Sequence, residues 1–272
     1  MTHSRPRVHD LLESNSLAPR RDLGQNFVAD PNTVRRIASL AHVGAGDHVV
    51  EIGAGLGSLT LALADTGAEI TAVEVDRGMV PVLTEVVADR ANVRVVEADA
   101  MRVDWDELLG AADRWVLVAN LPYNVATPLV CDVLDNVPRV ERLLVMVQRE
   151  VAERFAAQPR TPAYGAVSVK AAYWGTARVV GVVPASVFVP RPNVESALVE
   201  ITRRRPPDTA PQPLFDLVRT AFGHRRKMLR KSLAGVVTPA QFEQAAVDPT
   251  ARPEELDVAA WCRLAGSIDA GG

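Results

Sequence analysis

The chain has 272 residues, a formal net charge of −3 at pH 7, 48% hydrophobic residues and 23% charged residues. These values are typical of a globular protein that buries its core without disulfides or a structural metal, and they exclude a disordered or coiled-coil chain. No uncharged apolar run is long enough to span a membrane, and the N-terminus lacks the apolar core of a secretory signal. The two cysteines, Cys131 and Cys262, are far apart, so we expect reduced thiols and a cytoplasmic protein.

Short β-branched runs alternate with helical patterns along most of the chain. Asp30 followed by Pro31 predicts a helix start, with an acidic cap and a proline in the first turn. Strands are predicted at 48–52, 70–75, 93–97, 115–119 and 143–147, and further β-rich runs at 166–173 and 194–201. Helices are predicted at 59–64, 79–88, 127–134 and 148–157.

This alternation predicts an α/β fold with a doubly wound, mostly parallel sheet of seven strands. No helix is evident between the last two β-rich runs, so an antiparallel strand can close the sheet. Residues 205–213 are rich in proline and predict a linker, and only helical patterns follow it. We therefore divide the chain into an N-terminal arm (1–30), a sheet domain (31–206) and a small all-helical domain (207–272).

Positive charge is concentrated at the start of the helical region. Residues 202–231 contain nine lysines and arginines against two acids, a net charge of +7, which leaves about −10 for the remainder. The nine are Arg203, Arg204, Arg205, Arg219, Arg225, Arg226, Lys227, Arg230 and Lys231. Such asymmetry favours contact with a polyanion, although a solvated helix face has the same pattern.

A glycine-rich turn follows the first predicted strand. Gly53, Gly55 and Gly57 are spaced G-x-G-x-G, and Ser58 stands where the dinucleotide fingerprint requires its third glycine. Glycines let a backbone pass close to a ligand and adopt turn conformations that other residues avoid. The spacing favours a nucleoside with a small charged tail over a pyrophosphate, although an ordinary strand–helix turn has a similar sequence.

Polar side chains also end the next three predicted strands. Glu74 ends the second strand, where a carboxylate can accept both ribose hydroxyls of a nucleoside. Asp99 ends the third, where it can accept from an adenine amino group or cap the following segment. Asn120 ends the fourth and begins the sequence Asn-Leu-Pro-Tyr. Because parallel strands share one carboxyl edge, we expect these groups to line one ligand crevice.

The Asn-Leu-Pro-Tyr sequence is the most specific of these signals. The Asn120 amide oxygen and nearby carbonyls can accept the two hydrogens of an aromatic amine, and Pro122 stiffens the turn and lacks an N–H. Tyr123 offers a ring on which a base can stack. Accepting the amine hydrogens returns electron density to a nitrogen whose lone pair is delocalised into its ring. The pattern therefore favours group transfer to an exocyclic amine over the alternative, an ordinary Asn-Pro turn.

These stretches resemble the class I S-adenosylmethionine-dependent methyltransferases, and among them the rRNA adenine N6-dimethyltransferase family. The resemblance covers most of the chain from about residue 20. It rests on Leu23-Gly24-Gln25-Asn26-Phe27, 51–57, 73–76, 97–99, Asn120-Leu121-Pro122-Tyr123-Asn124, 187–196 and 225–230. The glycine loop is shared by many methyltransferases, whereas the segments at 23–27, 120–124 and 187–196 together are far more selective.

The resemblance implies roles for individual residues. Asn26, Val28, Gly53, Gly55, Glu74, Asp99 and Asn120 would bind S-adenosylmethionine, Glu74 at its ribose and Asp99 at its adenine. Asn120 and the carbonyl of Pro122 would hold the target N6, with Tyr123 and Phe188 on either side of a flipped adenine. Arg225, Arg226, Lys227, Arg230 and Lys231 would meet rRNA phosphates. The resemblance implies no metal, and the histidines lack metal-ligand spacing.

The implied reaction is N6,N6-dimethylation of two adjacent adenosines in a hairpin loop near the 3′ end of 16S rRNA. The substrate would be the immature small ribosomal subunit, and the enzyme a monomer without an obligate protein partner. Three alternatives stay open. They are a large-subunit rRNA dimethyltransferase that confers antibiotic resistance, a non-catalytic RNA-binding assembly factor, and a small-molecule methyltransferase. The segments at 23–27 and 187–196 favour the small-subunit enzyme.

Overall fold

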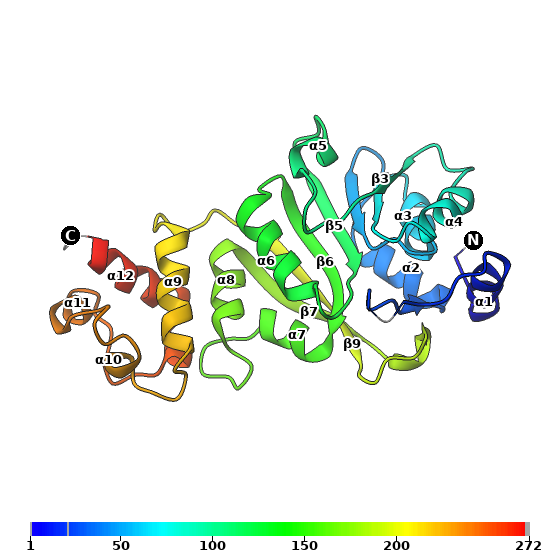
Figure 1. Cartoon of the computed structure of the whole chain (residues 1–272). Helices are drawn as coiled ribbons and strands as arrows, with labels where there is room; N and C mark the ends of the chain where they lie inside the picture. Colours follow the sequence, from blue (N-terminus) through cyan, green and yellow to red (C-terminus); the bar gives the residue numbers. More distant parts are fainter. Residues whose placement is uncertain (1, 21, 270–272) are drawn as a thin grey trace. The chain divides into compact units, whose positions relative to one another are not determined.

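The structure is a computed structural model, and it describes residues 2–20 and 22–269. Seven strands form one sheet in the order β4-β3-β2-β5-β6-β9-β7 (Figure 1). Their bounds are β2 His48–Ile52, β3 Glu69–Glu74, β4 Val93–Glu97, β5 Trp115–Asn120, β6 Val140–Gln148, β7 Gly175–Val183 and β9 Ser196–Arg203. The order reverses at β2, from which the chain first builds outward through β3 and β4 and then through β5 and β6. This doubly wound topology confirms the predicted fold class.

The strands from β4 to β6 run parallel, and β9 pairs antiparallel with β6, as the sequence allows, while β7 lies outside β9 at the edge of the sheet. Val50 of β2 lies between Thr71 of β3 and Leu117 of β5. Central strands are buried on both faces, so they need continuous runs of apolar residues rather than alternation. Because the register is parallel, the carboxyl ends of β2, β3 and β5 meet at one edge.

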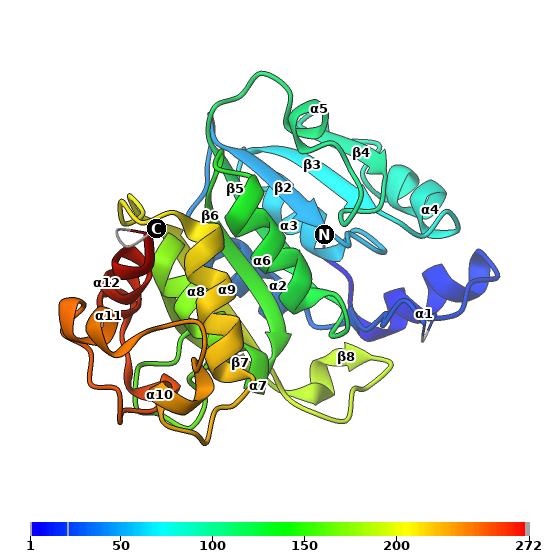
Figure 2. The ribbon, with the colours of Figure 1, turned by 60° about the vertical axis from the view of Figure 1, so that its left-hand side comes forward.

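Helices join the strands and cover the sheet. They are α2 Pro31–Leu40, α3 Ser58–Ala64, α4 Met79–Val86, α5 Trp105–Leu109 and α6 Ala126–Asn136. The Asp30 side chain accepts from the main chain of Thr33 at 2.9 Å and Pro31 occupies the first turn, so the predicted start of α2 is confirmed. In the view of Figure 2, α6 lies in front of the sheet.

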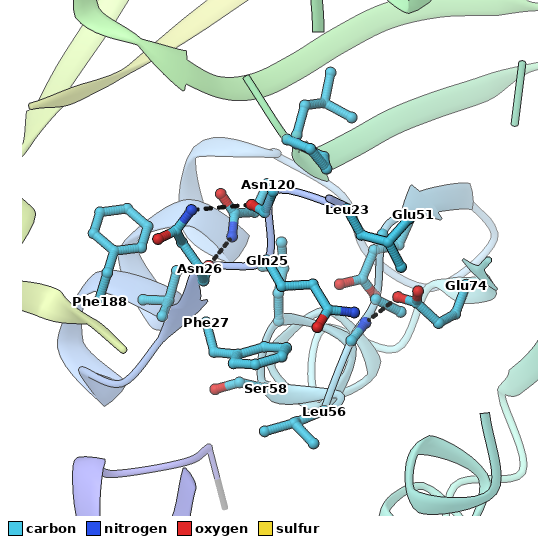
Figure 3. Close-up of a pocket in the computed structure, with 18 of the residues that line it drawn as sticks. Leu23, Gln25, Asn26, Phe27, Glu51, Leu56, Ser58, Glu74, Asn120 and Phe188 are labelled. Atoms are coloured by element: carbon cyan, nitrogen blue, oxygen red, sulfur yellow. Dashed lines mark hydrogen bonds between the residues drawn. The ribbon is translucent and has the colours of Figure 1, made fainter. Parts of the chain in front are cut away.

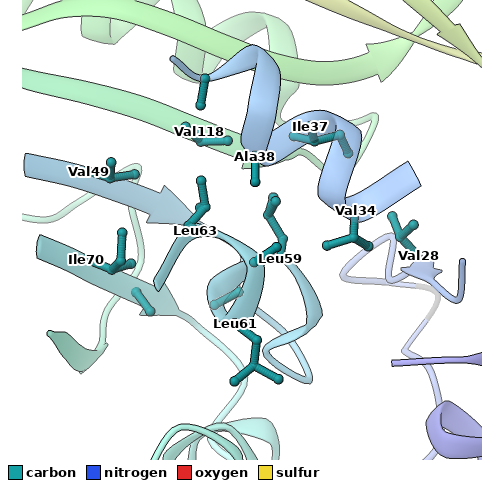
Figure 4. Close-up of a cluster of buried hydrophobic side chains, with 14 of the residues drawn as sticks. Val28, Val34, Ile37, Ala38, Val49, Leu59, Leu61, Leu63, Ile70 and Val118 are labelled. Atoms are coloured by element: carbon teal, nitrogen blue, oxygen red, sulfur yellow. The ribbon is translucent and has the colours of Figure 1, made fainter. Parts of the chain in front are cut away.

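The principal hydrophobic core lies between α2, α3 and the sheet (Figure 4). The cluster includes Val34 and Ile37 of α2, Leu63 of α3, and Val49 and Val118 of the central strands. All five side chains are at most 1% exposed. Burying each such side chain stabilises the fold by about 1.5–3 kcal/mol, which holds the turns between strands and helices in place.

The N-terminal arm contains a helix, α1 Arg5–Ser14, and a short strand, β1 Phe27–Val28. Val8, Leu11 and Leu12 recur at helical spacing and pack with Phe27 and Met79 in a second cluster. Strand β1 pairs antiparallel with β8 Phe188–Val189, so the arm meets the segment that precedes β9.

The predicted strand at 166–173 is wrong, because the structure has helix α8, Ala166–Trp174, at this position. Val169 and Tyr173 are buried four residues apart, which is the spacing of one helical face. The strand follows instead as β7, which begins at Gly175. Its edge position and Gly181 obscure the alternation that identifies a strand.

The remaining helices are α7 Arg149–Phe155, α9 Pro211–Phe222, α10 Leu229–Ser232, α11 Pro239–Gln244 and α12 Val258–Asp269. By compactness, one unit comprises the residues up to 152 with 179–202, and the other comprises 153–178 with the residues from 203 on. The second unit therefore includes α8, since Tyr173 packs in the same cluster as Leu214 and Trp261. Among the described residues, no helix is long and apolar enough to cross a membrane.

Candidate active site

A pocket opens at the carboxyl ends of β2, β3 and β5, where the N-terminal arm and the Phe188 segment also meet (Figure 3). It brings together nine of the residues that the sequence singles out. They are Asn26, Val28, Gly53, Gly55, Glu74, Asn120, Pro122, Tyr123 and Phe188. This convergence follows from the parallel register, because strand ends that are distant in sequence lie side by side.

The glycine turn lines this pocket and needs glycine at specific positions. Gly53 and Gly55 have φ angles of +74° and +55°. A Cβ at Gly55 would lie 3.1 Å from the Phe27 ring, so a side chain would press against the arm. The backbone can therefore turn sharply and remain close to any ligand in the pocket.

Glu74 is held in place by main-chain donors. Its Oε2 accepts from Gly55 N at 2.7 Å, and its Oε1 accepts from Val75 N at 3.0 Å and Asp76 N at 2.9 Å. Burial raises the pKa of Glu74 despite these bonds. Of about four acceptor positions on a carboxylate, three are used. One position on Oε2 stays open for a hydroxyl of a ligand.

Glu51 is a pocket residue that the sequence analysis missed. It lies within β2, is 1% exposed and lines the pocket beside Glu74. Burial raises its pKa to about 8, and within the described chain its Oε2 has no hydrogen-bond partner. A buried acid of this kind is suited to a cationic group on a ligand. An acid inside an otherwise β-branched strand, two residues before the glycine turn, was the available signal.

Asp99 lines a second, adjoining hollow that shares Gly53, Leu121 and Pro122 with the pocket. Its Oδ1 accepts from Met101 N at 3.0 Å, so Asp99 does cap the following turn. Its Oδ2 lies 3.7 Å from Arg102 Nε. The sequence analysis missed two apolar neighbours in this hollow, Val75 and Met101, which are 46% and 41% exposed. Such exposed apolar side chains suit a flat aromatic ring.

The side-chain amide of Asn120 has a fixed orientation. Its Nδ2 donates to the main-chain carbonyl of Asn26 at 2.9 Å (Figure 3). Asn26 in turn donates its own amide to the Gly24 carbonyl at 3.0 Å. Because the nitrogen end of Asn120 is committed to the arm, its oxygen end is the one available as an acceptor.

The Pro122 carbonyl is less available than the sequence suggests. It accepts from Val125 N and from Ala126 N, each at 3.1 Å, at the turn that begins α6. A carbonyl oxygen has two lone pairs, so both are engaged. Within the described chain no donor reaches the carbonyl of Leu121, one residue earlier. The Leu121 carbonyl is thus the main-chain acceptor next to Asn120 that is still unengaged.

The two aromatic residues come from different segments. Tyr123 is half-buried between β5 and α6, and its hydroxyl lies 3.0 Å from that of Ser196. Phe188 is 1% exposed, and its backbone pairs with Val28 of β1. Both side chains border the pocket.

The arm is pinned over the pocket by side chains that sequence analysis did not identify. His3 Nε2 lies 2.8 Å from the Leu56 carbonyl, and the His3 amide donates to Ser58 Oγ at 3.2 Å. Gln25 Nε2 donates to Asp76 Oδ2 at 2.8 Å. The His3 contacts hold the start of the arm against the glycine turn, and the Gln25 contact holds the entry loop, residues 22–26, next to the end of β3.

The predicted basic cluster lies in the second compact unit. Arg226, Lys227, Arg230 and Lys231 are exposed. Arg225 is half-buried instead, donates to the Pro162 carbonyl at 2.9 Å and lies 3.8 Å from Glu254. Arg225 is therefore engaged within the fold through its own side chain. Among residues 2–20 and 22–269, no group of three or more His, Cys, Asp or Glu side chains is placed to hold a metal ion.

Comparison with known proteins places this chain in a family. The profile of the ribosomal RNA adenine dimethylase family matches residues 17–270. The ribosomal RNA small subunit methyltransferase A of Nocardia farcinica (strain IFM 10152) is 47% identical over 276 residues, which cover 95% of this chain and 92% of the relative. That of Rhodococcus opacus (strain B4) is 46% identical and covers 96% and 92%.

Solved structures agree with this assignment. The 23S rRNA methyltransferase ErmE is 26% identical with a TM-score of 0.69, and the match covers 89% of this chain and 99% of that one. A dimethyladenosine transferase from Plasmodium falciparum shares the fold, with 23% identity, a TM-score of 0.75 and coverage of 86% and 94%. The chain therefore belongs to the ribosomal RNA adenine dimethylase family, and with it to the S-adenosylmethionine-dependent class I methyltransferases.

Proposed function

We propose that this chain dimethylates N6 of two adjacent adenosines in a hairpin loop near the 3′ end of 16S rRNA, during small-subunit biogenesis. The observation that carries the proposal is the Asn120 amide, whose nitrogen donates to Asn26 and whose oxygen is free to accept from an amine. Relatives named small subunit methyltransferase, 46–47% identical over nearly the whole chain, support this choice of subunit.

The pocket fits the cofactor. Glu51, with its unpartnered buried oxygen, suits the ammonium of the methionine moiety, and the positive-φ glycines leave room beside it. Glu74 has an acceptor position for a ribose hydroxyl, and Asp99 lies with Val75 and Met101 in a slot suited to adenine. Asn26 and Val28 would complete the wall from the arm. When bound, S-adenosylmethionine supplies an electrophilic methyl group on a sulfonium.

The protein's contribution to the reaction is chiefly positioning. Asn120 Oδ1 and the Leu121 carbonyl accept the two N6 hydrogens, which directs the nitrogen lone pair out of conjugation and toward the methyl group. Tyr123 and Phe188 hold the flipped base between them. The alkylated amine then loses its proton to water, so no side chain has to act as a base. After the first transfer, one N6 hydrogen remains for these acceptors.

The exposed cations Arg226, Lys227, Arg230 and Lys231 would contact rRNA phosphates, which adds affinity without reading sequence. Arg225 would not contact RNA directly, because its guanidinium is bound to the Pro162 carbonyl. It would instead help to hold the segment that carries the other four cations. The enzyme would act in the cytoplasm as a monomer on the immature small subunit.

The likeness to ErmE makes large-subunit RNA the alternative substrate. The test supplies tritiated S-adenosylmethionine with isolated small and large subunits from cells that lack this protein. We expect label in the small subunit, as dimethyladenosine at two neighbouring positions. Label only in the large subunit would favour the resistance enzyme, and no transfer to either would favour a non-catalytic assembly factor.

A further inference from the structure

Tyr123 and Ser196 are joined by a hydrogen bond between their hydroxyls, 3.0 Å long and spanning 73 residues of sequence. Ser196 is 1% exposed and is the first residue of β9. Tyr123 lies outside regular secondary structure, between β5 and α6. The bond thus connects a pocket-lining ring on an irregular segment to the end of a buried strand.

Ser196 is a rigid anchor because its neighbours are fixed from both sides. It lies opposite Gln148 in the antiparallel pair of β6 and β9. Just before it, Glu195 accepts from Arg149 N at 3.0 Å and pairs with the Arg149 guanidinium at 3.1 Å. Because Ser196 is buried and held in the register of β6 and β9, its hydroxyl moves little and can fix the group that binds to it.

The Tyr123 ring depends on this anchor for its orientation. Two side-chain torsions set a tyrosine ring, and the described contacts give its side chain no other polar partner. With the hydroxyl bound, the ring is fixed at both of its ends. Without that bond, the ring would lose part of its preorganisation and would pay the ordering entropy when a base arrives.

Ser196 also connects the Tyr123 ring to the segment of chain that carries Phe188. Phe188 precedes Ser196 in the segment that leads into β9, and Tyr123 reaches the same segment through its hydroxyl. Both rings border the pocket, and both are therefore connected to the stretch of chain from 188 to 196. Two aromatic rings that border one pocket suit a planar purine.

We infer that Ser196 is a positioning residue. Its hydroxyl fixes the Tyr123 ring in the orientation in which the ring stacks on the flipped adenine. The inference rests on the proposed function, since it presumes that Tyr123 stacks on the target base. Ser196 itself touches neither the base nor the cofactor, and its effect on the reaction passes through the tyrosine hydroxyl.

The test compares Ser196→Ala, Ser196→Thr, Tyr123→Phe and the double variant Ser196→Ala/Tyr123→Phe in the full-length protein. The readouts are the single-turnover methyl-transfer rate at saturating RNA and the fluorescence of RNA with 2-aminopurine at the target position. We expect Ser196→Ala and Tyr123→Phe each to slow transfer by about tenfold, the upper end of what one hydrogen bond contributes. The double variant should be no slower than either, because one bond is removed in all three. Ser196→Thr, which keeps the hydroxyl, should restore most of the rate.

Base stacking and cofactor binding give the discriminating signals. The 2-aminopurine emission should be brighter with Ser196→Ala than with the wild type at equal RNA occupancy, because a disordered ring quenches less. Affinity for S-adenosylhomocysteine should not change. Ser168→Ala is the matched control, since Ser168 is also fully buried and bonds the Arg154 carbonyl at 2.6 Å in the other compact unit. It should lower stability and leave the emission unaltered.

Three results would overturn the inference. The first is a Ser196→Ala variant whose methyl-transfer rate and 2-aminopurine emission equal those of the wild type. The second is a double variant that transfers methyl groups about a hundredfold more slowly than the wild type, which would mean that the two hydroxyls act independently. The third is a loss in Tyr123→Phe much greater than in Ser196→Ala, which would mean that the Tyr123 hydroxyl contacts RNA. Failure of the proposed function is distinct, since the wild type itself would then not methylate adenine.

Discussion

Asn120 at the end of β5 donates its side-chain amide to the main-chain carbonyl of Asn26, 2.9 Å away in the N-terminal arm. The residues are 94 positions apart, so only the folded arm can orient this amide. The arm is thus a component of the acceptor site rather than a mere extension. Because the nitrogen of Asn120 is already bound, its oxygen is the end that we propose accepts from the substrate amine.

Removing the Asn120 amide should slow methyl transfer severely. We expect Asn120→Ala to lower the methyl-transfer rate by about a hundredfold or more, the size of effect seen when one donor or acceptor is lost from a preorganised site. Affinity for S-adenosylhomocysteine, measured by titration calorimetry, should fall only modestly. Asn136→Ala, which removes an exposed amide bonded to Asp132, serves as the control. Sustained turnover by Asn120→Ala would refute the acceptor role.

Gly24 offers a way to disturb the same relationship without touching Asn120. It has a φ of +63°, and a Cβ there would lie 3.0 Å from Cβ of Pro122. We expect Gly24→Ala to push the entry loop away from the 120–123 segment and to slow methyl transfer by about tenfold or more. Gly46→Ala is the control, because Gly46 also has a positive φ, +91°, but has nothing within 4 Å of its added Cβ. If both variants transferred methyl groups equally well, the arm would not orient the acceptor.

Sequence patterns predicted the edge of the sheet at which the site forms, for a clear physical reason. Buried β-branched runs identify parallel strands, and the parallel register then brings Gly53, Glu74 and Asn120 to one edge. The cap at Asp30 is a local signal and was predicted correctly. At 166–173 the pattern failed, because short apolar runs fit a buried helix and a strand equally well.

Other features of the site depend on three-dimensional contacts that no local pattern encodes. The Pro122 carbonyl is engaged by the turn into α6, which spacing alone does not reveal. The Oε2 atom of Glu51 lacks a hydrogen-bond partner only because the surrounding chain buries it. Similarly, Arg225 looks like its basic neighbours in sequence, and only the fold gives it the Pro162 carbonyl as a partner.

The buried acid Glu51 should make the stability of the cofactor-free protein depend on pH. Its pKa is about 8 when folded and 4.5 in the reference state, so below pH 4.5 it is protonated in both states and has no effect. As the pH rises from 4.5 toward 8, only the unfolded chain ionises, which favours unfolding by about 3 kcal/mol at pH 7. We expect Glu51→Gln to lose this slope in denaturant unfolding followed across pH. Glu69→Gln, at an exposed position on β3, should keep it. Identical slopes in wild type and Glu51→Gln would contradict a buried, proton-binding Glu51.

The basic cluster should separate into RNA-binding residues and a structural residue. Neutralising Arg226, Lys227, Arg230 and Lys231 should weaken RNA binding. It should also reduce the slope of log K against log salt by about 0.7–0.9 for each phosphate that the variant no longer neutralises. Arg225→Ala should change the slope little and lower the melting temperature, because it deprives the Pro162 carbonyl of its donor and leaves Glu254 without its nearby cation. An unaltered salt dependence in the fourfold variant would remove the cluster from the RNA interface.

The contact of His3 with the glycine loop predicts that acid loosens the N-terminal arm. Burial is the main cause that lowers the pKa of His3 below 6.5, and the nearby Arg7 lowers it further. A depressed pKa means that the released arm takes up a proton more readily than the bound arm. The contact is therefore fully stable above pH 6.5 and weakens as the pH falls below it.

Hydrogen exchange of the α1 amides, compared between the wild type and His3→Gln at each pH, isolates this effect from the intrinsic pH dependence of exchange. We expect protection of α1 to fall in the wild type alone on going from about pH 7.5 to about pH 5.5. His9→Gln, at an exposed position on the same helix, should behave as the wild type does. A parallel response in His3→Gln would show that another group controls the arm.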